Sequence, residues 1–201
     1  MTSSPHDLSV DDGSTETVSP ELDRRFREAA ATARLLDVGF DVVESPVGPL
    51  LVAATDRGLC RISFRPDPEE QLDRLADAFG PRVLRSAAAV DSAHRQLDEY
   101  FDGRRRWFDL DTDLRTTVPF ARRVLDELAR VPYGETTTYG ALAQRVGAPR
   151  AARAVGTVMN RNAIPIVLPC HRVVGSNGSL TGYGGGLHVK EHLLRLEGVL
   201  L

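Results

Sequence analysis

The chain has 201 residues, of which 42% are hydrophobic and 26% charged, and its net charge is −3. This length predicts one or two domains with a full hydrophobic core, and two cysteines are too few for a disulfide framework, which favours a reducing compartment. No apolar run approaches the roughly 20 residues of a membrane span, and the polar residues after Met1 do not form a signal peptide, so we expect a cytoplasmic protein without a membrane partner.

The charge is distributed unevenly along the chain. From Val118 to Leu201 there are ten Lys and Arg against five Asp and Glu, so this part carries +5 and the remainder −8. Between Glu135 and Glu191 there is no acidic residue. A window of this length without carboxylates favours contact with a polyanion such as nucleic acid, although chance and an acidic N-terminus would produce the same balance.

The N-terminal residues predict a tail and a helix. Residues 1–18 are small, polar and acidic, which is typical of disorder. Ser19 is a suitable N-cap and Pro20 suits the first helical position, so a helix is predicted to follow. We therefore interpret residues 1–37 as an acidic tail and helix that are partly disordered.

Residues 38–112 predict a small α+β domain. Three short β-type runs are broken by Ser-Pro, Gly-Pro and Asp-Arg-Gly turns. Two helical stretches follow, near 68–79 and 86–101, and a short strand is predicted over 105–111. Cys60 lies in the third β-type run, where a lone cysteine is usually packed and unreactive.

Residues 113–201 predict a second, mainly helical domain. Helices are expected from Pro119, over 138–146, over 150–160 and over 187–196, and the middle two have helix-turn-helix spacing. The stretch "RVVGSNGSLTG" predicts a hairpin with an Asn-Gly turn, suitable as a wing. One face of the 150–160 helix is polar and basic, which favours DNA contact, although a solvated surface would look the same; its residues are Arg150, Arg153, Thr157 and Arg161.

Cys170 is the most informative residue of the chain. It follows Pro169, which has no N–H and interrupts regular structure, and it comes directly after an apolar run. A thiol becomes a nucleophile only as the thiolate, which needs a base or a positive environment. His171 is adjacent, but neighbours in an extended segment point apart, so a bridging water or a turn would be required. Glu197 is the carboxylate that we expect to orient this imidazole.

Other interpretations of these residues are a zinc site and a hydrolase. The stretch "HVKEH" fits an H-x-x-E-H zinc pattern, but a further ligand would be needed and few residues follow, so no metal is expected. "GYGGG" lacks the strand–helix context of a dinucleotide site. A cysteine hydrolase would need turnover through an acyl-enzyme, and no signature of such a family is present.

Four stretches together resemble one known family. "IPIVLPCHRVV", "GYGGGLHVKEHLLRLEG", "YGETTTYGALA" and "AARAVGTVMNRN" closely resemble the O6-alkylguanine-DNA alkyltransferases, the methylated-DNA–protein-cysteine methyltransferases. The specific resemblance covers about 119–198, and residues 38–111 are compatible with the variable N-terminal domain of the family. The implied fold is α+β, with a small N-terminal α/β, ribonuclease H-like domain before a winged-helix or helix-turn-helix domain.

The resemblance implies DNA repair by a single, irreversible alkyl transfer. The partner is double-stranded DNA containing O6-alkylguanine, and O4-alkylthymine is a further expected substrate; a monomer without cofactor or metal suffices. The alkyl acceptor is Cys170, His171 takes its proton through a water, and Glu197 orients His171. Asn162 braces the active-site turn. Flipping of the nucleotide out of the duplex is expected, at a cost of a few kcal/mol.

The resemblance also implies which residues bind the flipped nucleotide. Tyr139 contacts the guanine and its phosphate, and Arg153 fills the space that the base leaves. Tyr183 and the backbone of Gly184 line the pocket, and the Val173 carbonyl reads the guanine amino group. A non-catalytic protein that binds lesions, or regulates after binding them, would share this fold, but the presence of Cys170 argues against it.

Overall fold

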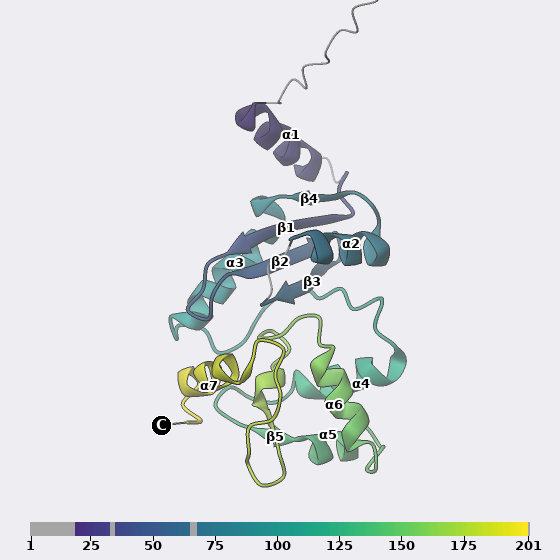
Figure 1. Ribbon diagram of the computed structural model, residues 1–201, viewed down its shortest axis with the longest axis vertical. Coiled ribbons are helices and arrows are strands. Elements are labelled where there is room, and N and C mark those ends of the chain that lie inside the picture. Colours follow the sequence, from purple (N-terminus) through teal and green to yellow (C-terminus); the bar gives the residue numbers. More distant parts are fainter. Residues whose placement is uncertain (1–18, 33–34, 65–67, 201) are drawn as a thin grey trace, which may run out of the picture.

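The computed structural model describes residues 19–32, 35–64 and 68–200 and shows a sheet-containing part stacked on a helical part (Figure 1). Helix α1 (Pro20–Thr32) begins at the predicted cap, where the Ser19 Oγ accepts a hydrogen bond of 3.2 Å from the Leu22 N–H. The expected disorder of residues 1–18 concerns a segment outside the described residues.

The N-terminal part is a four-stranded sheet with one helix on each face (Figure 1). Strands β1 (Val38–Val43), β2 (Leu50–Thr55) and β3 (Gly58–Ser63) form an antiparallel meander, and β4 (Val83–Arg85) pairs in parallel with β1. Alternate strand residues face opposite sides, so one face packs on α2 (Pro68–Phe79) and the other on α3 (Ala87–Phe101). Cys60 is buried on the α2 face, as predicted for a packed thiol, and burial raises its pKa to about 12.

One strand prediction for this part was wrong, and one strand was not predicted. Residues 105–111 do not form a strand; instead, Gln96 on α3 exchanges two hydrogen bonds of 2.8 Å with the backbone of Asp109, which occupies the groups that a strand would use. Only an isolated bridge joins Leu59 to Thr112. The fourth strand is β4, whose three residues are too few to show an alternating pattern in the sequence.

The C-terminal part contains the predicted helix-turn-helix. Its helices are α4 (Pro119–Leu128), α5 (Tyr139–Arg145), α6 (Ala152–Asn160) and α7 (Leu187–Leu196). The Thr138 Oγ1 caps α5 by accepting a hydrogen bond of 3.1 Å from the Ala141 N–H. Arg150 lies in the turn before α6 and not on the helix itself.

The predicted wing hairpin is not formed. The Asn-Gly turn exists and is closed by a 2.9 Å hydrogen bond from the Gly175 N–H to the Ser179 carbonyl. However, β6 (Val173–Val174) pairs in parallel with β5 (Thr137–Thr138), and no described strand follows the turn. Both valines are buried, whereas residues 176–179 of the turn are exposed.

The two parts share one hydrophobic core. Leu97 and Tyr100 of α3 belong to the same buried cluster as Leu128 of α4 and Leu193 of α7. In addition, the Ile62 N–H of β3 donates a 2.8 Å hydrogen bond to the Ala163 carbonyl, which lies just before the Cys170 segment. The sheet therefore contributes directly to the surroundings of Cys170. Within the described residues, no helix has the length and apolar character needed to cross a membrane.

Candidate active site

Cys170 lies at the start of a short 3-10 turn, Cys170–Arg172, that follows Pro169. The apolar run before it is a compact turn, in which the Leu168 N–H donates to the Ile164 carbonyl at 2.9 Å. Ile166 in this turn has φ of 73°, a left-handed conformation that is strongly unfavourable for a β-branched residue. Strain of this kind costs on the order of 1–3 kcal/mol and persists only where the surrounding packing fixes the backbone.

Asn162 fixes both the turn and the thiol. Its Nδ2 donates to the Leu168 carbonyl at 2.8 Å and to the Cys170 Sγ at 3.2 Å, while its Oδ1 accepts from the Ile164 N–H at 3.0 Å. The thiol is only 5% exposed. Burial raises the pKa of Cys170 to about 11, against the opposing effects of the Asn162 hydrogen bond and the nearby Lys190 cation. The resting group is therefore a neutral thiol, and a base must accept its proton before it can attack an alkyl carbon.

His171 is completely buried and contacts Glu197. Its Nε2 lies 2.9 Å from the Glu197 Oε1. Burial lowers the pKa of His171 although Glu197 opposes the change, so the imidazole is neutral at pH 7. Because the carboxylate can only accept, the proton is assigned to Nε2 and the Nδ1 lone pair is free to accept. Nδ1 is buried and has no hydrogen-bond partner among the described residues.

Glu197 is the centre of a buried hydrogen-bond network. Arg172 binds it through two nitrogens, each at 2.8 Å, and the Tyr100 hydroxyl donates to it at 2.8 Å. The Gly134 N–H adds a hydrogen bond of 3.3 Å. Burial alone would raise the pKa of Glu197, but the hydrogen bonds from His171 and Arg172 outweigh it and lower this pKa to about 2. Glu197 is therefore ionised and held rigidly against His171.

The local sequence explains why Glu197 stands there. It is the C-cap of α7, and Gly198 follows with φ of 75°, the left-handed conformation that commonly ends helices. Arg172 is anchored in turn by a 2.6 Å hydrogen bond from its Nη1 to the Val131 carbonyl. The sequence pattern predicted Glu197 but not Arg172 or Tyr100 as its partners.

Lys190 is a functional candidate that the sequence interpretation missed. It is fully buried on α7, and its Nζ donates to the Val173 carbonyl at 2.5 Å and to the Thr181 carbonyl at 3.3 Å. Among the described residues no carboxylate pairs with it. Its charge lies close enough to Cys170 to lower the thiol pKa. The spacing along α7 could have predicted the burial of Lys190, because this residue shares a helix face with Leu193 and Leu194. Such a position is unusual for an unpaired lysine.

Tyr183 and Gly184 lie beside the thiol, in a loop that Phe64 of the N-terminal domain contacts. With Cys170 and Asn162 they line a cavity of about 320 Å³. The Tyr183 hydroxyl is buried without a hydrogen-bond partner among the described residues, and its ring packs on Phe64 of the sheet part at a centroid distance of 5.4 Å. Burial raises the pKa of Tyr183 well above its ordinary value, so the phenol is neutral.

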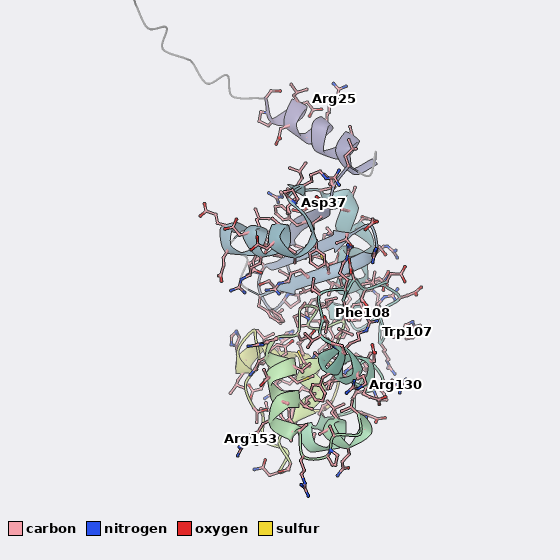
Figure 2. The ribbon with its side chains drawn as sticks, turned by 90° about the vertical axis from the view of Figure 1, so that its right-hand side faces the viewer. Arg25, Asp37, Trp107, Phe108, Arg130 and Arg153 are labelled. Atoms are coloured by element: carbon pink, nitrogen blue, oxygen red, sulfur yellow. The ribbon has the colours of Figure 1, made fainter. Side chains whose placement is uncertain are left out.

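The remaining predicted residues lie around α6 and the β6 segment. The Tyr139 hydroxyl is 2.6 Å from the Thr181 Oγ1, and its ring packs on Gly156 of α6. Arg153 is exposed and points away from α6 at the end of the molecule opposite α1 (Figure 2). Arg150 and Thr157 are exposed beside it. The structure thus gathers six predicted residues around one buried centre: Cys170, His171, Glu197, Asn162, Tyr183 and Val173. Gly184 is exposed at the edge of the cavity, and Arg150, Arg153 and Thr157 are on the surface.

The two histidines of α7 belong to the stretch that fits a zinc pattern in the sequence. His188 and His192 are both exposed. In the part of the chain that the structure describes, no group of three or more His, Cys, Asp or Glu side chains is placed to hold a metal ion.

These features define a class of two-domain proteins in which a helix-turn-helix domain holds a buried cysteine beside a His–Glu pair. Residues 39–114 match the family described as "6-O-methylguanine DNA methyltransferase, ribonuclease-like domain", and residues 119–199 match its "DNA binding domain". The chain belongs to the 6-O-methylguanine DNA methyltransferase family. This result confirms the predicted family and the predicted fold class.

Individual relatives agree with this assignment. The chain is 44% identical over 159 residues to a methylated-DNA–protein-cysteine methyltransferase of Methanosarcina barkeri, covering 79% of this chain and 96% of the relative. It is also 44% identical over 160 residues to the protein of the same name from Mycolicibacterium paratuberculosis, covering 80% and 92%. Among solved structures, Mycobacterium tuberculosis OGT in complex with DNA is similar with a TM-score of 0.70 at 39% identity, covering 79% of this chain and 92% of that chain.

Proposed function

We propose that the protein repairs DNA by transferring an alkyl group from guanine O6 to its own Cys170, once per molecule. The observation that carries this proposal is the buried centre in which Asn162 holds the Cys170 thiol and Glu197 holds the neutral imidazole of His171. The family and the methyltransferase names of its relatives support the same activity. We assign this chemistry to residues 113–201 and the supporting sheet domain to residues 38–112.

The transfer is a displacement at the alkyl carbon. His171 Nδ1 takes the thiol proton through a bridging water, because its Nε2–H is committed to Glu197. The sulfur of Cys170 then forms a bond to the alkyl carbon while the bond from that carbon to O6 breaks. The electron pair of the broken bond stays with guanine, which regains a proton. Overall, the alkyl group replaces the thiol hydrogen and unmodified guanine is left in the DNA.

Attack on the alkyl carbon attached to O6 requires the nucleotide to leave the base stack. We propose that α6 contacts the DNA, that Arg150 and Thr157 contact the backbone, and that Arg153 occupies the space left by the flipped base. The exposure of these three side chains and the absence of acidic residues between Glu135 and Glu191 support this assignment.

Tyr139, Val173, Tyr183 and Gly184 are proposed to hold the flipped base. The Val173 carbonyl already accepts from Lys190, but a carbonyl oxygen has two lone pairs and can also accept from a guanine amino group. A Cβ at Gly184 would meet no atom within 4 Å, so this backbone is open to a ligand. O4-alkylthymine, which presents an alkylated exocyclic oxygen on a smaller base, is proposed as a further substrate.

A titration of repair against protein concentration tests this function. A duplex containing O6-methylguanine is mixed with increasing amounts of protein, and the remaining modified base is measured after the reaction stops. The expected result is one guanine repaired per protein molecule and none with Cys170→Ala. Lesion binding without repair by either protein would instead favour a non-catalytic binding protein, and multiple turnover of esters or peptides would favour a hydrolase.

The remaining expectations concern the state of the protein in the cell. Each transfer uses one thiol, which a single chain supplies, so a monomer is sufficient. Cys60 and Cys170 are both free, which fits the reducing environment of the cytoplasm. The monomeric state and the cytoplasmic location stay predictions.

A further inference from the structure

The cavity beside Cys170 is lined by residues of both domains. Its volume of about 320 Å³ is many times that of a methyl group, which is comparable in size to a water molecule at roughly 30 Å³. Of the residues that we assign to the base, Tyr183 and Gly184 line it beside Cys170, whereas Tyr139 and Val173 do not. The part of the cavity that the base does not fill is therefore available to the group attached to O6.

One wall of this cavity is built by the sheet domain. Arg61 and Phe64 of β3 and its following turn, together with Gln71 of α2, line the same cavity as Cys170. The Phe64 ring closes one side, because it packs on Tyr183 and lies so near Gly185 that a Cβ there would be 2.9 Å from the ring. The hydrogen bond from Ile62 to Ala163 fixes β3 against the Cys170 segment. This wall is thus rigidly connected to the reacting sulfur.

Arg61 gives that wall of the cavity a positive charge. Its side chain is half-buried, and its Nε donates a 3.1 Å hydrogen bond to the Oε1 of the buried Gln71. The described residues provide neither an acceptor for its two terminal nitrogens nor a carboxylate that pairs with it. The nearby Glu70 is on the exposed rim and is paired with Arg74 at 2.5 Å. A half-buried guanidinium with free donors is a strong binding site for a carboxylate.

This inference rests on the proposed function: we propose that Arg61 is a specificity-determining residue and that the cavity shared by Cys170 and the sheet domain is a subsite for alkyl groups with an anionic end. The carbon attached to O6 still moves to the Cys170 sulfur, and the distal carboxylate accepts hydrogen bonds from the Arg61 guanidinium. The N-terminal domain would in this way select adducts, beyond supporting the C-terminal domain.

Single-turnover kinetics on three duplexes test the subsite. The duplexes carry O6-methylguanine, O6-carboxymethylguanine and the neutral isostere O6-carbamoylmethylguanine. The wild-type protein is expected to react faster with the carboxymethyl group than with its amide. Arg61→Gln is expected to lower the carboxymethyl rate by about tenfold or more, the loss typical of a charge-assisted hydrogen bond, and to change the methyl rate by less than about twofold. Arg61→Lys should retain part of the preference.

Arg74→Gln is the matched control, because it removes a positive charge from the exposed rim of the same cavity. It is expected to leave all three rates within about twofold, since exposed ion pairs contribute little. Equal slowing of the methyl and carboxymethyl reactions by Arg61→Gln, with an unchanged unfolding midpoint, would overturn the subsite, as would equal wild-type rates for the acid and the amide. Failure of the wild-type protein to remove even the methyl group would overturn the proposed function instead.

Discussion

Replacement of Glu197 by Gln should damage both the stability of the fold and the transfer reaction. The carboxylate accepts hydrogen bonds from His171, Arg172, Tyr100 and Gly134 inside the protein. An amide of the same shape removes the negative charge and leaves the Arg172 guanidinium, which is almost completely buried, without a counter-ion. It also removes the group that keeps the pKa of His171 from falling further.

The expected loss of folding stability follows from the pKa of Glu197. The ordinary value is 4.5 and the folded value is about 2. At 1.36 kcal/mol per pH unit, this difference corresponds to about 3 kcal/mol of stability. Removal of one member of a buried ion pair typically costs about 3–5 kcal/mol, which agrees in magnitude. Because the folded pKa is lowered, this stabilisation is complete above pH 4.5 and is lost as the pH falls towards 2.

Denaturant unfolding measured by circular dichroism at pH 7 and pH 3 checks this prediction, with Glu191→Gln as the control. Glu191 is on the same helix but exposed, so the chemical change is identical and the expected loss is within about 0.5 kcal/mol. Glu197→Gln should lose about 3 kcal/mol at pH 7 and less at pH 3, and its alkyl transfer should slow by about 100-fold or more, as expected for disturbed general-base catalysis. Equal unfolding free energies for the two variants would refute the central role given to the Glu197 network.

Three further predictions address the thiol, the buried lysine and the DNA surface. The rate of Cys170 alkylation by iodoacetamide should rise with pH up to about pH 11, because burial raises the thiol pKa to about 11; a plateau below pH 8 would contradict this. Lys190→Met should raise the thiol pKa further and slow methyl transfer by about tenfold or more in single-turnover kinetics, since it removes a nearby cation and leaves the Val173 and Thr181 carbonyls without their donor. Arg153→Ala should slow transfer from duplex DNA but leave transfer from free O6-benzylguanine base within about twofold, and equal slowing of both would exclude a role in flipping.

Local sequence signals predicted the helices of this protein well. Proline and capping residues mark where α1, α4 and α5 begin, and Gly198 marks where α7 ends, so these boundaries depend on backbone chemistry that a short window contains. The strand predicted over 105–111 failed because a side chain from another element, Gln96, satisfies that backbone. Competition of this kind is tertiary and is not visible in a local pattern.

The candidate site was only partly predictable for the same reason. Cys170, His171 and Glu197 stood out by residue type and by resemblance, and the structure places them together. Lys190 and Arg61 did not stand out, because a lysine or arginine in a soluble protein is normally on the surface. Their significance depends on burial without a carboxylate partner among the described residues, which only the assembled fold reveals.

Intact-protein mass spectrometry after reaction with a short O6-methylguanine duplex tests directly whether Cys170 accepts the alkyl group. Each protein molecule is expected to gain the mass of one CH₂ group, because a methyl replaces the thiol hydrogen. Peptide mapping should place the methyl on Cys170, and Cys170→Ala should gain nothing. An unchanged mass despite tight binding to the lesion, or a methyl on Cys60, would contradict this assignment.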